Sequence, residues 1–128
     1  MSRRWNRRAS LGVLLASGLV FAACGGGGGG SGGTKTATGG RIDVNAYDPF
    51  RFDVKTINAL PGELTITLHE KGATEHRFTI SSPKFEVKVT PANPVATGKV
   101  TLAAGTYPFK CSFDGHAAAG MVGKIVVG

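Results

Sequence analysis

The chain has 128 residues, 41% of them hydrophobic, and a formal net charge of +7. Four of its 15 basic residues lie in the first 23 positions, so the rest carries 11 basic against eight acidic residues, a net charge of +3. The length is that of one small domain, and because most of the basicity belongs to the N-terminus, we expect no nucleic-acid partner.

The first segment, Met1–Ala23, is predicted to be a signal peptide. Met1–Arg8 contains four arginines, and Leu11–Ala23 is an apolar run that ends in small residues. This order is typical of a secretory signal, and the run is shorter than the roughly 20 apolar residues of a membrane-spanning helix. No later stretch approaches that length, so we expect no transmembrane helix in the mature chain.

Cys24 follows the apolar run in the sequence Val-Phe-Ala-Ala-Cys. This sequence resembles the lipobox of bacterial lipoproteins, which implies that cleavage leaves Cys24 at the N-terminus with lipid attached to it. The alternative is ordinary cleavage near Ala23, with Cys24 a free thiol. We expect an exported protein, anchored to the cell membrane through lipid on Cys24 and facing the periplasm or the extracellular space.

Residues 24–40 are predicted to be the lipidated cysteine followed by a disordered tether. Gly25–Gly40 is almost entirely Gly, Ser and Thr, and such a segment cannot bury apolar surface. The predicted domain therefore spans 41–128.

This predicted domain shows period-two alternation of apolar and polar residues and no sustained helical period. Turn signals such as Leu60-Pro61-Gly62 and Ala104-Gly105 separate the alternating runs. Many short strands at this spacing indicate an all-β fold, an antiparallel β-sandwich. The predicted strands lie around residues 41–44, 50–55, 63–69, 77–80, 84–89, 99–102, 106–111 and 124–127.

The stretch Tyr107–Met121 contains Cys111, His116 and Met121 in the spacing C-x4-H-x4-M. If Cys24 is lipidated, Cys111 is the only thiol of the folded part, and it is an inert buried thiol, a reactive thiol or a metal thiolate. The neighbouring His and Met favour the metal. Two His, one Cys and a weak axial Met form the ligand set of a blue-copper site, whereas zinc needs no Met.

Strand parity supplies a candidate for the missing second histidine. His69 shares parity with polar threonines and should face water. His76 shares parity with Phe78 and Ile80, so its ring should point into the sandwich, where an imidazole needs a hydrogen-bond partner or a metal. Cys111 shares its face with the apolar residues of its own strand. We therefore predict a metal site of His76, Cys111, His116 and Met121.

The segments Gly105–His116 and Gly120–Gly123 strongly resemble the C-terminal copper loop of cupredoxins, and Leu64–Ile80 resembles that family's first histidine segment. The resemblance implies a Greek-key β-sandwich of about seven or eight strands. It also implies one copper ion that cycles between Cu(I) and Cu(II), with His76, Cys111 and His116 as equatorial ligands and Met121 as the axial ligand. Arg77 stands where many relatives have Asn, and Asp114 where Pro is common.

A coordinatively filled site suits single-electron transfer, so we expect an electron carrier and not an enzyme. The predicted signal peptide and lipid anchor place this carrier on the outer side of a bacterial membrane. We expect redox proteins to dock near His116 and Ala117–Ala119, and we expect a monomer. The alternative on the same fold is a lipoprotein that stores or delivers copper. A metal-free binding module is a third hypothesis, against which the four ligands argue.

Overall fold

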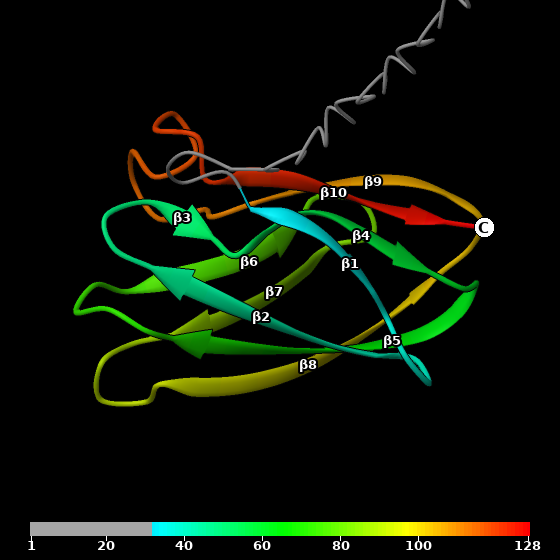
Figure 1. Ribbon diagram of the computed structural model, residues 1–128, viewed down its shortest axis with the longest axis horizontal. Helices are drawn as coiled ribbons and strands as arrows, with labels where there is room; N and C mark the ends of the chain where they lie inside the picture. Colours follow the sequence, from blue (N-terminus) through cyan, green and yellow to red (C-terminus); the bar gives the residue numbers. More distant parts are fainter. Residues whose placement is uncertain (1–31) are drawn as a thin grey trace, which may run out of the picture.

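The computed structural model describes residues 32–128, so the predicted signal peptide, Cys24 and most of the predicted tether lie outside the described residues. The described residues form ten strands and no helix, arranged as two facing sheets (Figure 1). In spatial order, the larger sheet contains β1 (Gly33–Thr36), β4 (Val54–Ala59), β10 (Val122–Val127), β9 (Gly105–Lys110), β6 (His76–Ile80) and β7 (Phe85–Val89). The smaller sheet contains β3 (Arg51–Phe52), β2 (Arg41–Tyr47), β5 (Gly62–Glu70) and β8 (Val95–Leu102).

The alternation in the sequence explains which faces meet. Residues of one parity along β2, β5, β6 and β9 are buried, and they fill the space between the sheets. Three aromatic rings form the centre of this core: Phe78 stacks on Phe109 at 4.4 Å between centroids, and Phe52 packs against both. The predicted all-β sandwich is confirmed.

Strand direction differs from the prediction of an antiparallel sandwich. β4 pairs in parallel with both β1 and β10, and β2 pairs in parallel with β5. The remaining strand pairs are antiparallel. Alternation reports which face of a strand is buried but not the direction of its neighbour, so both sheets are mixed.

The predicted strand at 50–55 is in fact two strands on different sheets. β3 pairs with β2 in the smaller sheet, whereas β4 pairs with β1 and β10 in the larger one. The chain changes sheet at Asp53, whose carboxylate accepts hydrogen bonds from Asn45 and Lys35. Because of this change, Phe52 and Val54 are buried, but Phe50 lies in the preceding turn and is 40% exposed.

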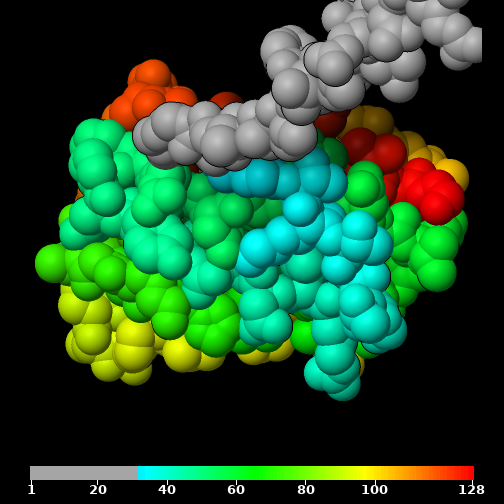
Figure 2. Space-filling view, viewed as in Figure 1, coloured from blue at the N-terminus to red at the C-terminus, as the bar shows by residue number. Residues whose placement is uncertain are grey.

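The domain begins earlier than the predicted boundary at Arg41. Gly33–Thr36 forms β1 at the edge of the larger sheet, and Figure 2 shows this segment lying across the viewed face of the molecule. β1 pairs in parallel with β4, and the Lys35 ammonium group also reaches the Asp53 carboxylate at 2.6 Å and the backbone oxygen of Asp43 at 2.9 Å. The prediction of a disordered tether up to Gly40 is therefore wrong for residues 33–36.

Loops that are far apart in the sequence gather at the end of the sandwich opposite the C-terminus (Figure 1). They are the turn after β2, the loop between β5 and β6, and the long loop between β9 and β10. None of the described residues belongs to a helix long and apolar enough to cross a bilayer. The residues with ligand chemistry lie at this loop end.

Candidate metal centre

Two neighbouring strands of the larger sheet position the first two donors. His76 is the first residue of β6, and Cys111 follows directly after β9, which pairs with β6. Both side chains point inward and are fully buried, as strand parity predicted. The backbone N–H of Arg77 donates to the Cys111 sulfur over 3.3 Å, so the strand that carries His76 also holds the thiol.

The loop after Cys111 returns the chain to the same place. The N–H of His116 donates to the Phe113 oxygen, and the N–H of Met121 donates to the His116 oxygen, both over 3.1 Å. The N–H of Cys111 donates to the Met121 oxygen over 2.9 Å, which closes the loop. Gly115 and Gly120 have φ of 80° and 103°, conformations that favour glycine, and they allow these tight turns.

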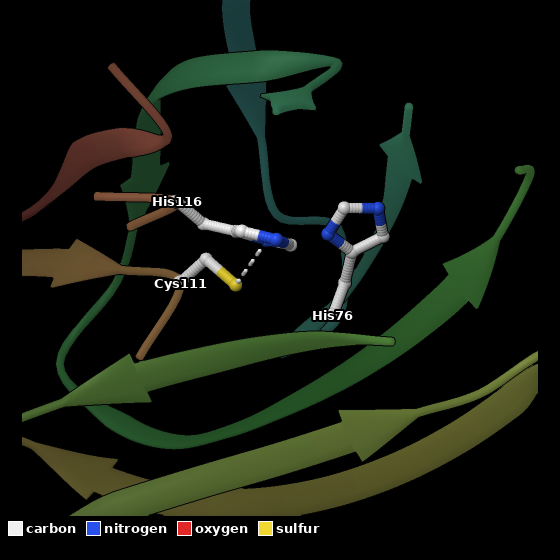
Figure 3. Close-up of side chains that lie close together, drawn as sticks. All are labelled: His76, Cys111 and His116. Atoms are coloured by element: carbon white, nitrogen blue, oxygen red, sulfur yellow. Dashed lines mark hydrogen bonds between the residues drawn. The ribbon is translucent and has the colours of Figure 1, made fainter. Parts of the chain in front are cut away.

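The donor atoms of His76, Cys111 and His116 all lie within 4.8 Å of one another (Figure 3). His116 Nδ1 is 3.5 Å from the Cys111 sulfur, and the two imidazole centroids are 5.0 Å apart. Met121 is fully buried and is hydrogen-bonded through its backbone to both Cys111 and His116. The structure therefore brings the first three predicted residues together and places the fourth beside them.

Burial shifts the pKa values of Cys111 and His116 in opposite directions. Desolvation raises the pKa of the Cys111 thiol, although the N–H groups of Arg77 and Phe113 partly oppose this. Desolvation lowers the pKa of His116, and the nearby His76 lowers it further. A buried neutral imidazole is ready to act as a ligand, whereas the thiol must lose its proton when a metal binds.

The donor set fits one copper ion. His76 Nδ1 is buried without any hydrogen-bond partner, which is costly unless something occupies that side of the ring. The other donors nearby are a thiol sulfur and an imidazole nitrogen, and Met121 adds a thioether. Sulfur and imidazole together are the ligands that copper prefers, and the combination is that of a type 1 site.

Aromatic side chains cover the outer side of His116. Phe50 and Phe113 lie with their centroids 4.7 Å and 4.8 Å from the His116 ring, and His116 is only 3% exposed. Beyond it, Ala118 and Ala119 are exposed and Ala117 is partly exposed. The apolar rim around His116 thus consists of two phenylalanines as well as the predicted alanines.

Two carboxylates on the other side of His76 were missed by the sequence analysis. Asp48 Oδ1 lies 3.2 Å and Glu70 Oε2 lies 3.9 Å from His76 Nε2. Glu70 continues the buried parity of Leu64, Ile66 and Leu68 along β5, and that pattern alone indicates a buried carboxylate in need of a partner. Asp48 lies in a turn, where alternation gives no such signal.

The remaining histidine and the two residues noted as departures have other partners. His69 lies outside the site, half-buried, with its Nε2 2.8 Å from Asp43. The Arg77 guanidinium pairs with Glu75 and lies 5.7 Å from the centre of the Phe113 ring. Asp114 is exposed at the surface of the loop.

Comparison with known proteins connects this architecture to copper proteins. A family model described as a cupredoxin-like domain matches residues 33–127, a range that begins with β1. Reduced rusticyanin is 26% identical, with a TM-score of 0.57 over 73% of this chain and 83% of that chain. A further rusticyanin structure, which is also 26% identical, is described as that of a copper protein.

Two more distant structures share the fold alone. Auracyanin from Roseiflexus castenholzii is 19% identical, with a TM-score of 0.57 over 72% of this chain and 98% of that chain. Oxidised plastocyanin from Dryopteris crassirhizoma is 20% identical, with a TM-score of 0.55 over 68% of this chain and all of that chain. No curated protein sequence matches the chain.

Proposed function

Because the chain belongs to the cupredoxin-like domain family, we propose that it carries single electrons by means of one type 1 copper ion. His76, Cys111 and His116 are the equatorial ligands in this proposal, and Met121 is the axial ligand. The observation that carries it is the convergence of one sulfur and two imidazoles, all buried, within 4.8 Å.

The bound ion would supply a Cu(I)/Cu(II) couple. The protein would hold the four ligands in the same positions in both oxidation states. His76 and Cys111 are held by paired strands, and His116 and Met121 by the hydrogen bonds of a closed loop. Four protein donors leave no position for a substrate, and burial excludes water. This arrangement supports electron transfer in preference to catalysis.

Electrons would enter and leave at the rim around His116. We define this rim as Phe50, Phe113 and Ala117–Ala119, which form an apolar surface over the imidazole. Redox partners form small, short-lived interfaces, so such a surface is sufficient for a protein donor or acceptor. The charge of +3 on the chain after residue 23 would attract an acidic partner.

The predicted lipid anchor completes the proposal. Lipid on Cys24 would hold the domain at the outer side of a bacterial membrane, with the glycine-rich sequence after it as a tether. The support is the lipobox-like sequence before Cys24 and the glycine run after it. Partition of the exported protein into detergent, lost on Cys24→Ser, would support the anchor, and unchanged partition would contradict it.

Voltammetry of the copper-loaded protein distinguishes an electron carrier from a protein that stores or delivers copper. A carrier gives a reversible one-electron wave and keeps its metal through repeated cycles in the presence of a Cu(I) chelator. Loss of copper to the chelator on reduction would instead favour storage or delivery.

A further inference from the structure

Asp48 and Glu70 approach the side of the His76 ring that faces away from Cys111 and His116. Asp48 Oδ1 lies 3.2 Å from His76 Nε2, and Glu70 Oε2 lies 3.9 Å from the same nitrogen. The Glu70 side chain is 1% exposed and the Asp48 side chain 35% exposed. We call these two residues the carboxylate clasp.

Local backbone groups hold each member of the clasp. The N–H of Ala73 donates to Asp48 Oδ2, and the N–H of Gly72 donates to Glu70 Oε1, both over 2.6 Å. One oxygen of each carboxylate is therefore fixed by the loop between β5 and β6, and the other oxygen is left to face His76. Glu70 Oε2 has no hydrogen-bond partner, and the imidazole is the basic group beside it.

The clasp determines which nitrogen of His76 carries the proton. An ionised carboxylate can only accept a hydrogen bond, so Nε2 must donate to Asp48 and Nδ1 must keep its lone pair. Nδ1 is the buried nitrogen without a partner. A second hydrogen bond of this kind orients a metal-binding histidine and raises its basicity.

We infer that Asp48 and Glu70 are positioning residues that present His76 Nδ1 to the copper and favour Cu(II) over Cu(I). The inference rests on the proposed function, because the second effect needs the bound metal. Negative charge beside a ligand stabilises the more positive ion, and a largely buried site screens this attraction less than a surface does. The clasp therefore lowers the reduction potential.

The test compares Asp48→Asn and Glu70→Gln with Asp43→Asn. Asp43 is a matched control because it forms a similar pair, at 2.8 Å, with His69, which is not one of the four proposed ligands. Voltammetry of the copper-loaded proteins should show a higher potential in both clasp variants. We expect at least a tenfold loss of preference for Cu(II), which is about 59 mV for one electron, and a smaller shift in the control.

A second readout does not need copper. Nitrogen–proton correlation spectra of the copper-free protein should show His76 protonated at Nε2. The share of the Nδ1–H form should grow in Asp48→Ala, because this variant removes the acceptor oxygen that an asparagine would keep. If Glu70→Gln does not fold, Asp48→Asn alone tests the inference, because the Asp48 side chain is more exposed than that of Glu70. Potentials that match the control, or an unchanged tautomer, would overturn the inference.

The two proposals fail in different ways. If the unaltered protein shows no reversible couple, the proposed function fails, and the tautomer measurement still decides the positioning role. If a second equivalent of metal binds and Asp48→Asn abolishes it, the clasp is a metal site in its own right, and the positioning role is wrong.

Discussion

The backbone N–H of Arg77 points at the sulfur of Cys111 from 3.3 Å. This contact joins the strand that begins at His76 to the end of the strand that precedes Cys111, so the two ligands share one rigid support. An N–H donor also stabilises a thiolate and partly offsets the burial that raises the pKa of Cys111. The contact is made by the backbone, so it does not depend on the side chain at position 77.

Cys111→Ser should abolish the intense visible absorption of the copper-loaded protein, because an alcohol cannot replace the thiolate in the copper bond. Cys24→Ser is the matched control and should leave the spectrum unchanged. Absorption spectra after addition of one equivalent of Cu(II) provide the measurement. A band that survives in Cys111→Ser and disappears in Cys24→Ser would show that the wrong thiol has been assigned.

Met121→Leu should keep the absorption band but raise the reduction potential. Leucine fills a similar volume but lacks the weak axial sulfur. Because that sulfur stabilises Cu(II) more than Cu(I), its removal raises the reduction potential. A rise of about 59 mV corresponds to a tenfold change in relative affinity. Voltammetry measures it, and the retained band verifies that the other three ligands are in place. An unchanged potential would show that Met121 does not act on the copper.

Ala118→Asp should slow electron exchange between oxidised and reduced copies of the protein. Two copies would meet at the rim around His116, where the substitution places like charges opposite each other, and such contacts cost several kcal/mol. We expect a fall of about tenfold or more in the exchange rate, measured by NMR line broadening. Thr101→Asp adds the same charge at an exposed position near the C-terminal end of β8, which lies away from the loop end of the sandwich. This control variant should have little effect on the exchange rate. Equal slowing by both would place the exchange surface elsewhere.

The loss of stability on acidification should depend in part on Asp53. Burial raises the pKa of this carboxyl, but hydrogen bonds from Lys35 and Asn45 outweigh that effect and hold the pKa below its ordinary value. The folded pKa is thus lower than the unfolded pKa of about 4. The contribution to stability is therefore complete above pH 4 and disappears as the pH falls through the folded pKa.

Urea unfolding of the copper-free protein tests this contribution. At pH 7, Asp53→Asn should lower the free energy of unfolding by about 1.5–3 kcal/mol, the usual range for hydrogen bonds to a charged group. The difference between the two proteins should shrink as the pH falls below the unfolded pKa of about 4, because the folded protein then gains less from an ionised Asp53. A difference that does not change with pH would contradict the account.

Much of the fold could be predicted because alternation reports burial. His76 and Cys111 were placed on inward faces by the parity of Phe78 and Phe109, and the structure buries all four. The C-x4-H-x4-M spacing predicted that His116 and Met121 return to Cys111, and the hydrogen bonds of the loop explain how they do so.

The features that were missed depend on contacts between distant segments. β1 pairs with β4 and Lys35 reaches Asp53, which lies 18 residues further along the chain, so neither contact gives a local pattern in the sequence. The parallel pairing of β2 with β5 follows from the passage of the chain through the larger sheet as β4, and Phe50 is exposed because it lies in the turn before β3. Asp48 approaches His76 across 28 residues, so only the folded chain reveals the contact.

The most direct test of the central claim is the visible spectrum of the purified protein after one equivalent of Cu(II), then ascorbate, then reoxidation. The account predicts an intense blue or green band from a copper bond to the Cys111 thiolate, which bleaches on reduction and returns on reoxidation. A pale spectrum without that band, or a band that does not return, would contradict a type 1 copper site that carries electrons.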